Sequence, residues 1–161
     1  MDYVITTHDA PELSIVSIRD RCPTGGVPGF VGGAFRDLFG RLHLLGVAPA
    51  GHPFVIYHEF GPDGVDAEAC VPVAEPVSAS GTVKARTLPA RTVARTVHVG
   101  PYENLGAAYA ALTHWIGSKG FESAGPIRER YLNGPGDQAS PTEYRTEIEI
   151  PIVASLIAVP V

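Results

Sequence analysis

The feature that most constrains the fold is an internal repeat, in which two parts of the chain match in the same order. Four residues recur 74 positions later: Phe35 as Tyr109, Gly46 as Gly120, Gly51 as Gly125 and Tyr57 as Tyr131. After the next turn the offset becomes 79, so Glu68 matches Glu147 and Pro72 matches Pro151. One small unit leaves part of its helix and sheet uncovered, so two copies are expected to fold together.

A helix is expected in the second copy, from about 102 to 119. Its apolar residues recur at steps of four, three and four, which is one face of an α-helix: Leu105, Tyr109, Leu112 and Ile116. Trp115 lies beside this stripe, and Gly120 is a usual helix stop. The first copy has a matching helix over 30–45, whose apolar stripe includes Phe35 and Phe39.

The remaining segments read mostly as strands and turns. Strands are expected over 12–19, 53–60, 65–73, 82–88, 91–99, 126–132 and 143–153, and loops over 22–29, 74–81 and 133–141. Residues 1–11 are expected to be an edge segment or a lead-in. The fold class is therefore α+β, a tandem β-α-β-β repeat. It should form one antiparallel sheet with two main helices on one face and a ligand cleft between them.

Length and composition favour one domain over 1–161, with repeats at about 12–73 and 82–153 and a hinge at 74–81. The net charge of −5 argues against nucleic acid as a partner and is compatible with cationic ligands. No signal peptide and no membrane span are predicted, so the protein is expected to be cytoplasmic, with Cys22 and Cys70 as free thiols. The six histidines lack zinc-site spacing and no cofactor motif is present, so neither metal nor cofactor is expected.

Three motifs occur in order in the second half. They read H-V-G-P-Y-E-N-L-G-x-A-Y-x-x-L-x-x-W-I from residue 98, G-x-x-x-A-G-P-x-R-E-x-Y-L-N from 120, and P-x-x-Y-R-T-E-I-x-I-P-I from 141. Together they resemble the GyrI-like small-molecule-binding family, the effector-binding domain type of AraC- and MerR-type multidrug regulators. The resemblance is dense over 91–153 and extends through the repeat over 12–73.

The resemblance implies a cleft for large, aromatic, hydrophobic and often cationic molecules. It carries the acidic pocket residue to Glu147, and it carries the aromatic positions to Tyr131, Trp115 and Tyr109. By the repeat, Phe35, Phe39 and Tyr57 are their partners. Only about ten residues precede the first expected strand, so the chain is expected to be a stand-alone member without a DNA-binding domain.

Two other functions stay open. The chain could be a hydrolase of strained, electrophilic natural products such as cyclopropanoids, with Glu147 as base or electrostatic stabiliser and Tyr131 as proton donor. It could also be an interaction module that neutralises a protein. Glu147 alternates with Ile148 and could instead face water. The aromatic residues on the helix could instead be core. The oligomeric state is left open.

Overall fold

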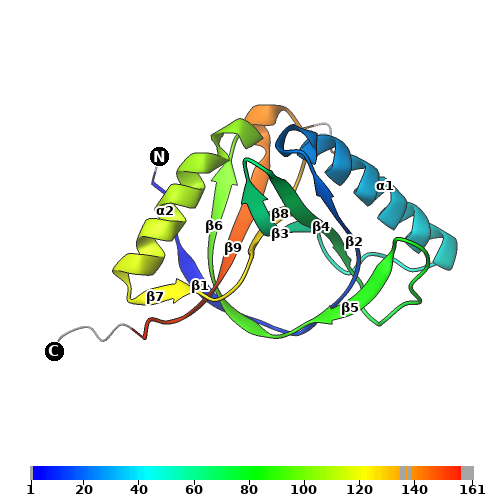
Figure 1. Ribbon diagram of the computed structural model, residues 1–161, viewed down its shortest axis with the longest axis horizontal. Helices are drawn as coiled ribbons and strands as arrows, with labels where there is room; N and C mark the ends of the chain where they lie inside the picture. Colours follow the sequence, from blue (N-terminus) through cyan, green and yellow to red (C-terminus); the bar gives the residue numbers. More distant parts are fainter. Residues whose placement is uncertain (1, 135–136, 138, 157–161) are drawn as a thin grey trace. The chain divides into compact units, whose positions relative to one another are not determined.

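The structure is a computed structural model that describes residues 2–134, 137 and 139–156. The chain divides into two compact units. The N-terminal unit is Pro11–Ala90, and the C-terminal unit is Met1–Ala10 together with Arg91–Val161. Each unit has antiparallel strands and one long helix (Figure 1), so the predicted α+β class is confirmed. No helix among the described residues is both long and apolar enough to cross a bilayer.

The N-terminal unit is a four-stranded sheet with one helix. Its elements are β2 (Leu13–Cys22), α1 (Val27–Leu45), β3 (Phe54–Gly61), β4 (Gly64–Pro72) and β5 (Lys84–Leu88). The strand order is β3-β4-β2-β5, and every neighbouring pair is antiparallel. The strand expected over 82–88 therefore pairs with β2, inside the first copy of the repeat.

Helix α1 begins three residues earlier than expected, because a glycine-rich run that reads as loop contains its first turn. Pro28 lies in that turn, where its missing N–H has no helical partner to lose. The helix ends at Gly46, whose φ of 70° is in the left-handed region. Its buried side chains Ala34, Leu38 and Leu42 pack against alternate residues of β2 and β4, so one face of the sheet is covered by the helix.

The C-terminal unit repeats this plan. Its elements are β1 (Thr6–Ala10), β6 (Arg91–Val99), α2 (Leu105–Ser118), β7 (Phe121–Ser123), β8 (Ile127–Tyr131) and β9 (Arg145–Ala154). The order is β1-β6-β9-β8, with β7 pairing separately with β9. The segment expected as an edge or lead-in is strand β1, which pairs with β6 through Thr6–Ala10. The short strand β7 was not expected.

Helix α2 covers one face of the sheet of the C-terminal unit. Its buried residues contact Ala94 of β6 and three isoleucines of β9: Ile148, Ile150 and Ile152. We call this side the helix face. Successive side chains of a strand point to opposite sides, so Glu147 and Glu149 lie on the other side, which we call the far face.

Candidate functional site

The helix face of the C-terminal unit holds a buried carboxylate between two tyrosines. Glu129 of β8 accepts hydrogen bonds from the hydroxyl of Tyr109 on α2 and from that of Tyr131, with the second O–O distance at 3.0 Å. Tyr131 is two residues along the same strand, so its ring shares the face of Glu129. The side chains of Ile127 and Tyr109 also contact the core under α2, which fixes the cluster beside the helix.

Glu129 differs from other buried acids of the chain in having no cationic partner among the described residues. Glu129 is 8% exposed. Burial raises its pKa above the ordinary value, and the hydrogen bonds from Tyr109 and Tyr131 offset only part of that rise. The site thus keeps a carboxylate in a poorly solvated place where two neutral hydroxyls are its partners.

Further aromatic rings continue from this cluster. Tyr102, in the 3-10 turn Tyr102–Asn104 before α2, stacks on Tyr144 with ring centres 5.0 Å apart. It also meets Tyr131 edge to face at 5.9 Å. Burial raises the pKa of Tyr102, and the nearby charge of Glu129 raises it further, so its hydroxyl lies in the field of that carboxylate. Gly134 leaves room for this hydroxyl, since a Cβ there would lie 3.0 Å from it.

The predicted acid Glu147 lies in a different environment, on the far face. Arg95 and Arg130 bridge Glu147 and Glu149, with Arg95 Nη2 at 3.0 Å from Glu149 Oε2 and Arg95 Nε at 3.3 Å from Glu147 Oε1. Burial alone would raise the pKa of Glu149, but the charges of Arg130 and Arg95 outweigh it and lower that pKa. Glu147 therefore belongs to an ion-pair layer, on the opposite side of the sheet from Tyr109 and Tyr131.

The other predicted aromatic residues form three ring pairs. Trp115 stacks on Phe121 at 6.2 Å and packs against the core under α2. In the N-terminal unit, Phe35 and Phe39 contact each other on α1 at 6.3 Å, and Tyr57 meets Phe60 at 5.8 Å. Of the predicted set, Tyr109 and Tyr131 are joined through one carboxylate, that of Glu129.

Sequence reasoning missed Glu129, although a signal was present. In I-R-E-R-Y the glutamate and the tyrosine are two apart, so they share one face of the strand, while Arg128 and Arg130 share the other. The two faces of this strand therefore differ in chemistry, with an acid and an aromatic ring on one and two arginines on the other. That pattern identifies Glu129 as the acid on the aromatic side.

The N-terminal unit has a buried acid of its own, which is fully paired. Glu68 of β4 accepts hydrogen bonds from Ser17 at 2.6 Å and from both Nε and Nη2 of Arg86, and it contacts His58 Nε2 at 2.8 Å. Burial would raise its pKa, but these partners lower it to about 2. All four oxygen lone-pair directions are used, so this cluster stabilises the sheet and leaves no place for a ligand cation.

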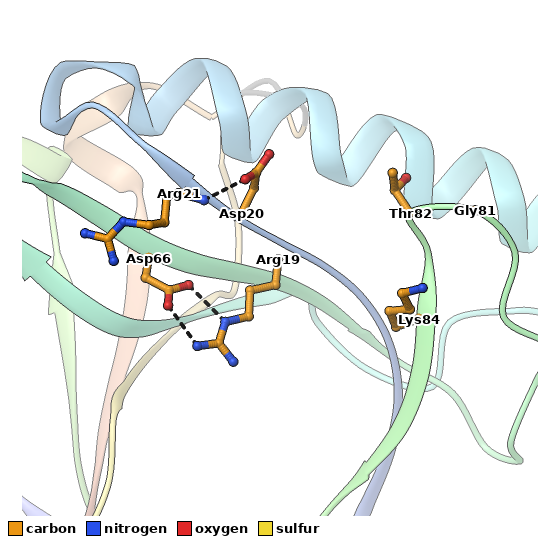
Figure 2. A pocket seen from close by; sticks show the side chains of 7 residues that line it. All are labelled: Arg19, Asp20, Arg21, Asp66, Gly81, Thr82 and Lys84. Atoms are coloured by element: carbon orange, nitrogen blue, oxygen red, sulfur yellow. Dashed lines mark hydrogen bonds and ion pairs between the residues drawn. The ribbon is translucent and has the colours of Figure 1, made fainter.

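Two surface hollows of the N-terminal unit have a charged lining. The larger, of about 590 Å³, is lined by Arg19, Asp20, Arg21, Asp66, Gly81, Thr82 and Lys84 (Figure 2). Arg19 and Asp66 form an ion pair in this hollow, in which Arg19 donates to both carboxylate oxygens of Asp66 at 2.9 and 2.8 Å. The two charges therefore neutralise each other. The smaller, of about 370 Å³, lies around Cys22 and Pro62. Neither hollow has the aromatic lining typical of an organic-ligand site, so we place the candidate site at Glu129.

No three His, Cys, Asp or Glu side chains gather as metal ligands within the residues that the structure describes. The chemistry available at the site is therefore that of one carboxyl group, several phenols and aromatic faces. This combination suits an organic cation, which needs a counter-charge and apolar contact together.

Comparison with known proteins gives the family of the fold. A family model for the GyrI-like small molecule binding domain matches residues 3–153. The crystal structure of the EcmrR C-terminal domain is 25% identical with a TM-score of 0.78, covering 96% of this chain and 99% of that one. The EcmrR chain in a cryo-EM complex with DNA is 24% identical with a TM-score of 0.82; 96% of this chain is covered, but it spans only 58% of that chain.

A third structure contains a bound ligand. SAV2435 bound to tetraphenylphosphonium is 16% identical, with a TM-score of 0.65, covering 95% of this chain and 94% of that one. At this identity the likeness concerns the fold. No curated protein matches the chain at a significant level.

Proposed function

Since the chain belongs to the family of GyrI-like small-molecule-binding domains, we propose that it binds hydrophobic organic cations, with Glu129 as the counter-charge. The observation that carries the proposal is the state of this carboxylate. It is buried, its pKa is raised, and no Lys, Arg or His of the described chain forms an ion pair with it. A buried carboxylate loses several kcal/mol of hydration, so an unpaired one favours the arrival of a cation.

The surrounding rings support an aromatic or otherwise delocalised cation. Tyr102, Tyr109 and Tyr131 lie around Glu129 with their rings partly exposed. Each ring face that meets a cation adds about 0.5–2 kcal/mol, more when the contact is dry. A strongly hydrated cation such as sodium would lose more hydration than these rings return, so the site favours large, weakly hydrated ions.

The composition supports the same class of ligand. A net charge of −5 attracts cations and disfavours nucleic acid as a direct partner. The fold relative SAV2435 was solved with tetraphenylphosphonium, a lipophilic aromatic cation, which makes this ion a suitable first probe.

The test is a calorimetric titration of the wild-type protein with tetraphenylphosphonium, repeated with the neutral analogue triphenylmethane delivered in cosolvent. We expect the cation to bind in the micromolar range and the neutral analogue to bind at least about tenfold more weakly, since Coulomb attraction is lost. Equal affinity for the two would mean that the carboxylate does not recognise charge, and absence of binding would refute the proposal.

A second candidate function is hydrolysis of a strained electrophile, favoured by the raised pKa of Glu129. A carboxyl group with a raised pKa is a better general base at neutral pH, and a tyrosine hydroxyl at 3.0 Å could donate a proton to a leaving group. In this function Glu129 takes a proton from water, the water oxygen bonds to the electrophilic carbon, and Tyr131 protonates the departing atom. Incubation with a cyclopropane-bearing alkylator and mass spectrometry for the addition of one water distinguishes a hydrolase from a binder.

A further inference from the structure

A buried histidine connects the start of the chain to the turn that holds Tyr102. His98, near the end of β6, is 3% exposed. Its Nδ1 lies 2.8 Å from the hydroxyl of Tyr3, and its Nε2 lies 3.3 Å from the carbonyl oxygen of Pro101. Because a carbonyl only accepts, Nε2 carries the proton and donates to Pro101. In the neutral ring Nδ1 then accepts from the Tyr3 hydroxyl.

The two segments that His98 contacts, the start of the chain and the turn at Pro101, are each held by further hydrogen bonds. On one side, the Thr96 hydroxyl donates to the carbonyl of Val4 at 2.9 Å, and Thr6–Ala10 then continue as β1 along β6. We call residues 3–10 the N-terminal segment. It is therefore attached to β6 through side chains of two alternate residues and then through the backbone.

On the other side, the Pro101 carbonyl begins the turn that carries the aromatic ring. It accepts from the Asn104 backbone N–H at 3.1 Å as well as from His98. The preceding Gly100 has a φ of 134° and donates its N–H to the Tyr144 carbonyl at 2.8 Å. Tyr102 is the next residue after Pro101, so the orientation of this peptide decides where the Tyr102 ring lies.

We propose that His98 is a positioning residue that couples docking of the N-terminal segment to the placement of Tyr102 beside Glu129. The inference rests on the proposed function, since Tyr102 matters only if a ligand binds at Glu129. When Tyr3 holds the imidazole, the ring orients its Nε2–H toward Pro101 and the Tyr102 ring stays on the stack with Tyr144. Coupling free energies are reciprocal, so ligand binding at Glu129 must in turn favour docking of the segment.

Three substitutions separate the two contacts of the imidazole. Tyr3→Phe removes the hydroxyl and keeps the ring in the core under α2. His98→Gln keeps a donor at the distance of Nε2, so it preserves the Pro101 contact without the link to Tyr3. His98→Asn keeps an acceptor at the distance of Nδ1, so it preserves the link to Tyr3 and loses the contact to Pro101.

The affinity for tetraphenylphosphonium is measured for each variant and for the double variant Tyr3→Phe with His98→Gln. We expect Tyr3→Phe and His98→Asn each to weaken binding about fivefold, at the low end of typical couplings between sites. His98→Gln should bind within about twofold of wild type, and adding Tyr3→Phe to it should have no effect, because the link is already cut. A purely structural role would instead make Tyr3→Phe equally harmful in both backgrounds, which would overturn the proposal.

Hydrogen exchange of the full chain tests the reciprocal effect. Binding of the cation should slow exchange of the amides in residues 3–10 of wild type, and this slowing should disappear in Tyr3→Phe and His98→Gln. Asp9→Ala is the control, since it removes the acceptor of the bond from the Thr92 hydroxyl at the other end of β1, and it should retain the slowing at residues 3–6. Exchange that is unchanged by the ligand in wild type would refute the coupling.

The outcomes keep the two proposals distinct. If wild type does not bind the cation, both fail. If the cation binds and Glu129→Gln weakens binding at least about tenfold, while Tyr3→Phe changes neither affinity nor exchange, the ligand site stands and the coupling through His98 is wrong.

Discussion

Replacing Glu129 with glutamine tests the site most directly, because the variant keeps the shape and removes the charge. At a separation of about 4 Å and an effective dielectric constant near 20, a carboxylate and a cation attract by about 4 kcal/mol. The ligand loses part of its own hydration, so we expect a net loss of about 1.5–3 kcal/mol, which is roughly ten- to hundredfold in Kd. Isothermal titration with tetraphenylphosphonium at low salt measures this loss.

The stability of the same variant should change in the opposite direction. Burial raises the pKa of Glu129 in the folded state, so folding disfavours its ionised form. Its contribution to the free energy of unfolding therefore becomes less favourable as the pH rises from the unfolded pKa through the folded one. Glu129→Gln removes this dependence, and at pH 8 the variant should be at least as stable as wild type. A binding loss that came with a loss of stability would point to misfolding instead.

Glu147→Gln is the matched control, since it makes the same chemical change on the far face. Glu147 is bridged by Arg95 and Arg130, so we expect lower stability and unchanged ligand affinity. The reverse result, with binding lost in Glu147→Gln and kept in Glu129→Gln, would show that the acid carried over from the family motif is the ligand acid and that the geometric argument is wrong.

Three further predictions concern ionisation. Tyr109→Phe removes a hydrogen bond that lowers the pKa of Glu129, so the pH at which cation affinity reaches half its maximum should move upward in titrations between pH 4 and 8. Glu149→Gln leaves Arg95 and Arg130 with one carboxylate in a buried layer and should lower the free energy of unfolding by about 3 kcal/mol in urea denaturation. Glu68 has a folded pKa of about 2 against an ordinary 4.5, so its stabilisation is present above about pH 4.5 and is lost as the pH falls toward 2. Glu68→Gln should therefore cost about 2–3 kcal/mol at pH 7, and the difference from wild type should shrink in acid.

The repeat and the element order could be predicted from sequence because local signals carry them. Gly46, with its left-handed conformation, ends α1 where its counterpart Gly120 was expected to end α2, and β6 has the predicted bounds Arg91–Val99. The start of α1 was misplaced because Gly25, Gly26 and Gly29 read as loop, while Pro28 in the first turn favours a helix. Strand β7 is only three residues long and has too few residues to show a period.

The candidate acidic site is harder to predict because it depends on which face of the sheet each acid occupies. Ile148 and Ile150 alternate with Glu147, and once these isoleucines are assigned to the core under α2, Glu147 must lie on the far face. The alternation that places Glu147 on the far face can be read from the sequence. The pairing of β8 with β9 cannot, and it is this register that brings Arg130 opposite Glu147 and Arg128 opposite Glu149. Ion pairs between neighbouring strands depend on which residues lie opposite each other, and this register cannot be read from the sequence alone.

The repeat also shows how the described buried acids differ between the two units. Glu68 and Glu147 correspond at the offset of 79, and both lie on the sheet face away from their own helix, where arginines bind them. These two acids have the same structural role in both copies. At the offset of 74, Glu129 corresponds to Val55, which is fully buried on β3. The first copy therefore keeps an apolar core at the position where the second has a carboxylate among tyrosines. Because packing alone favours valine there, a carboxylate at Glu129 lowers stability unless a ligand uses it, and this cost is the physical reason to expect a cation at the site.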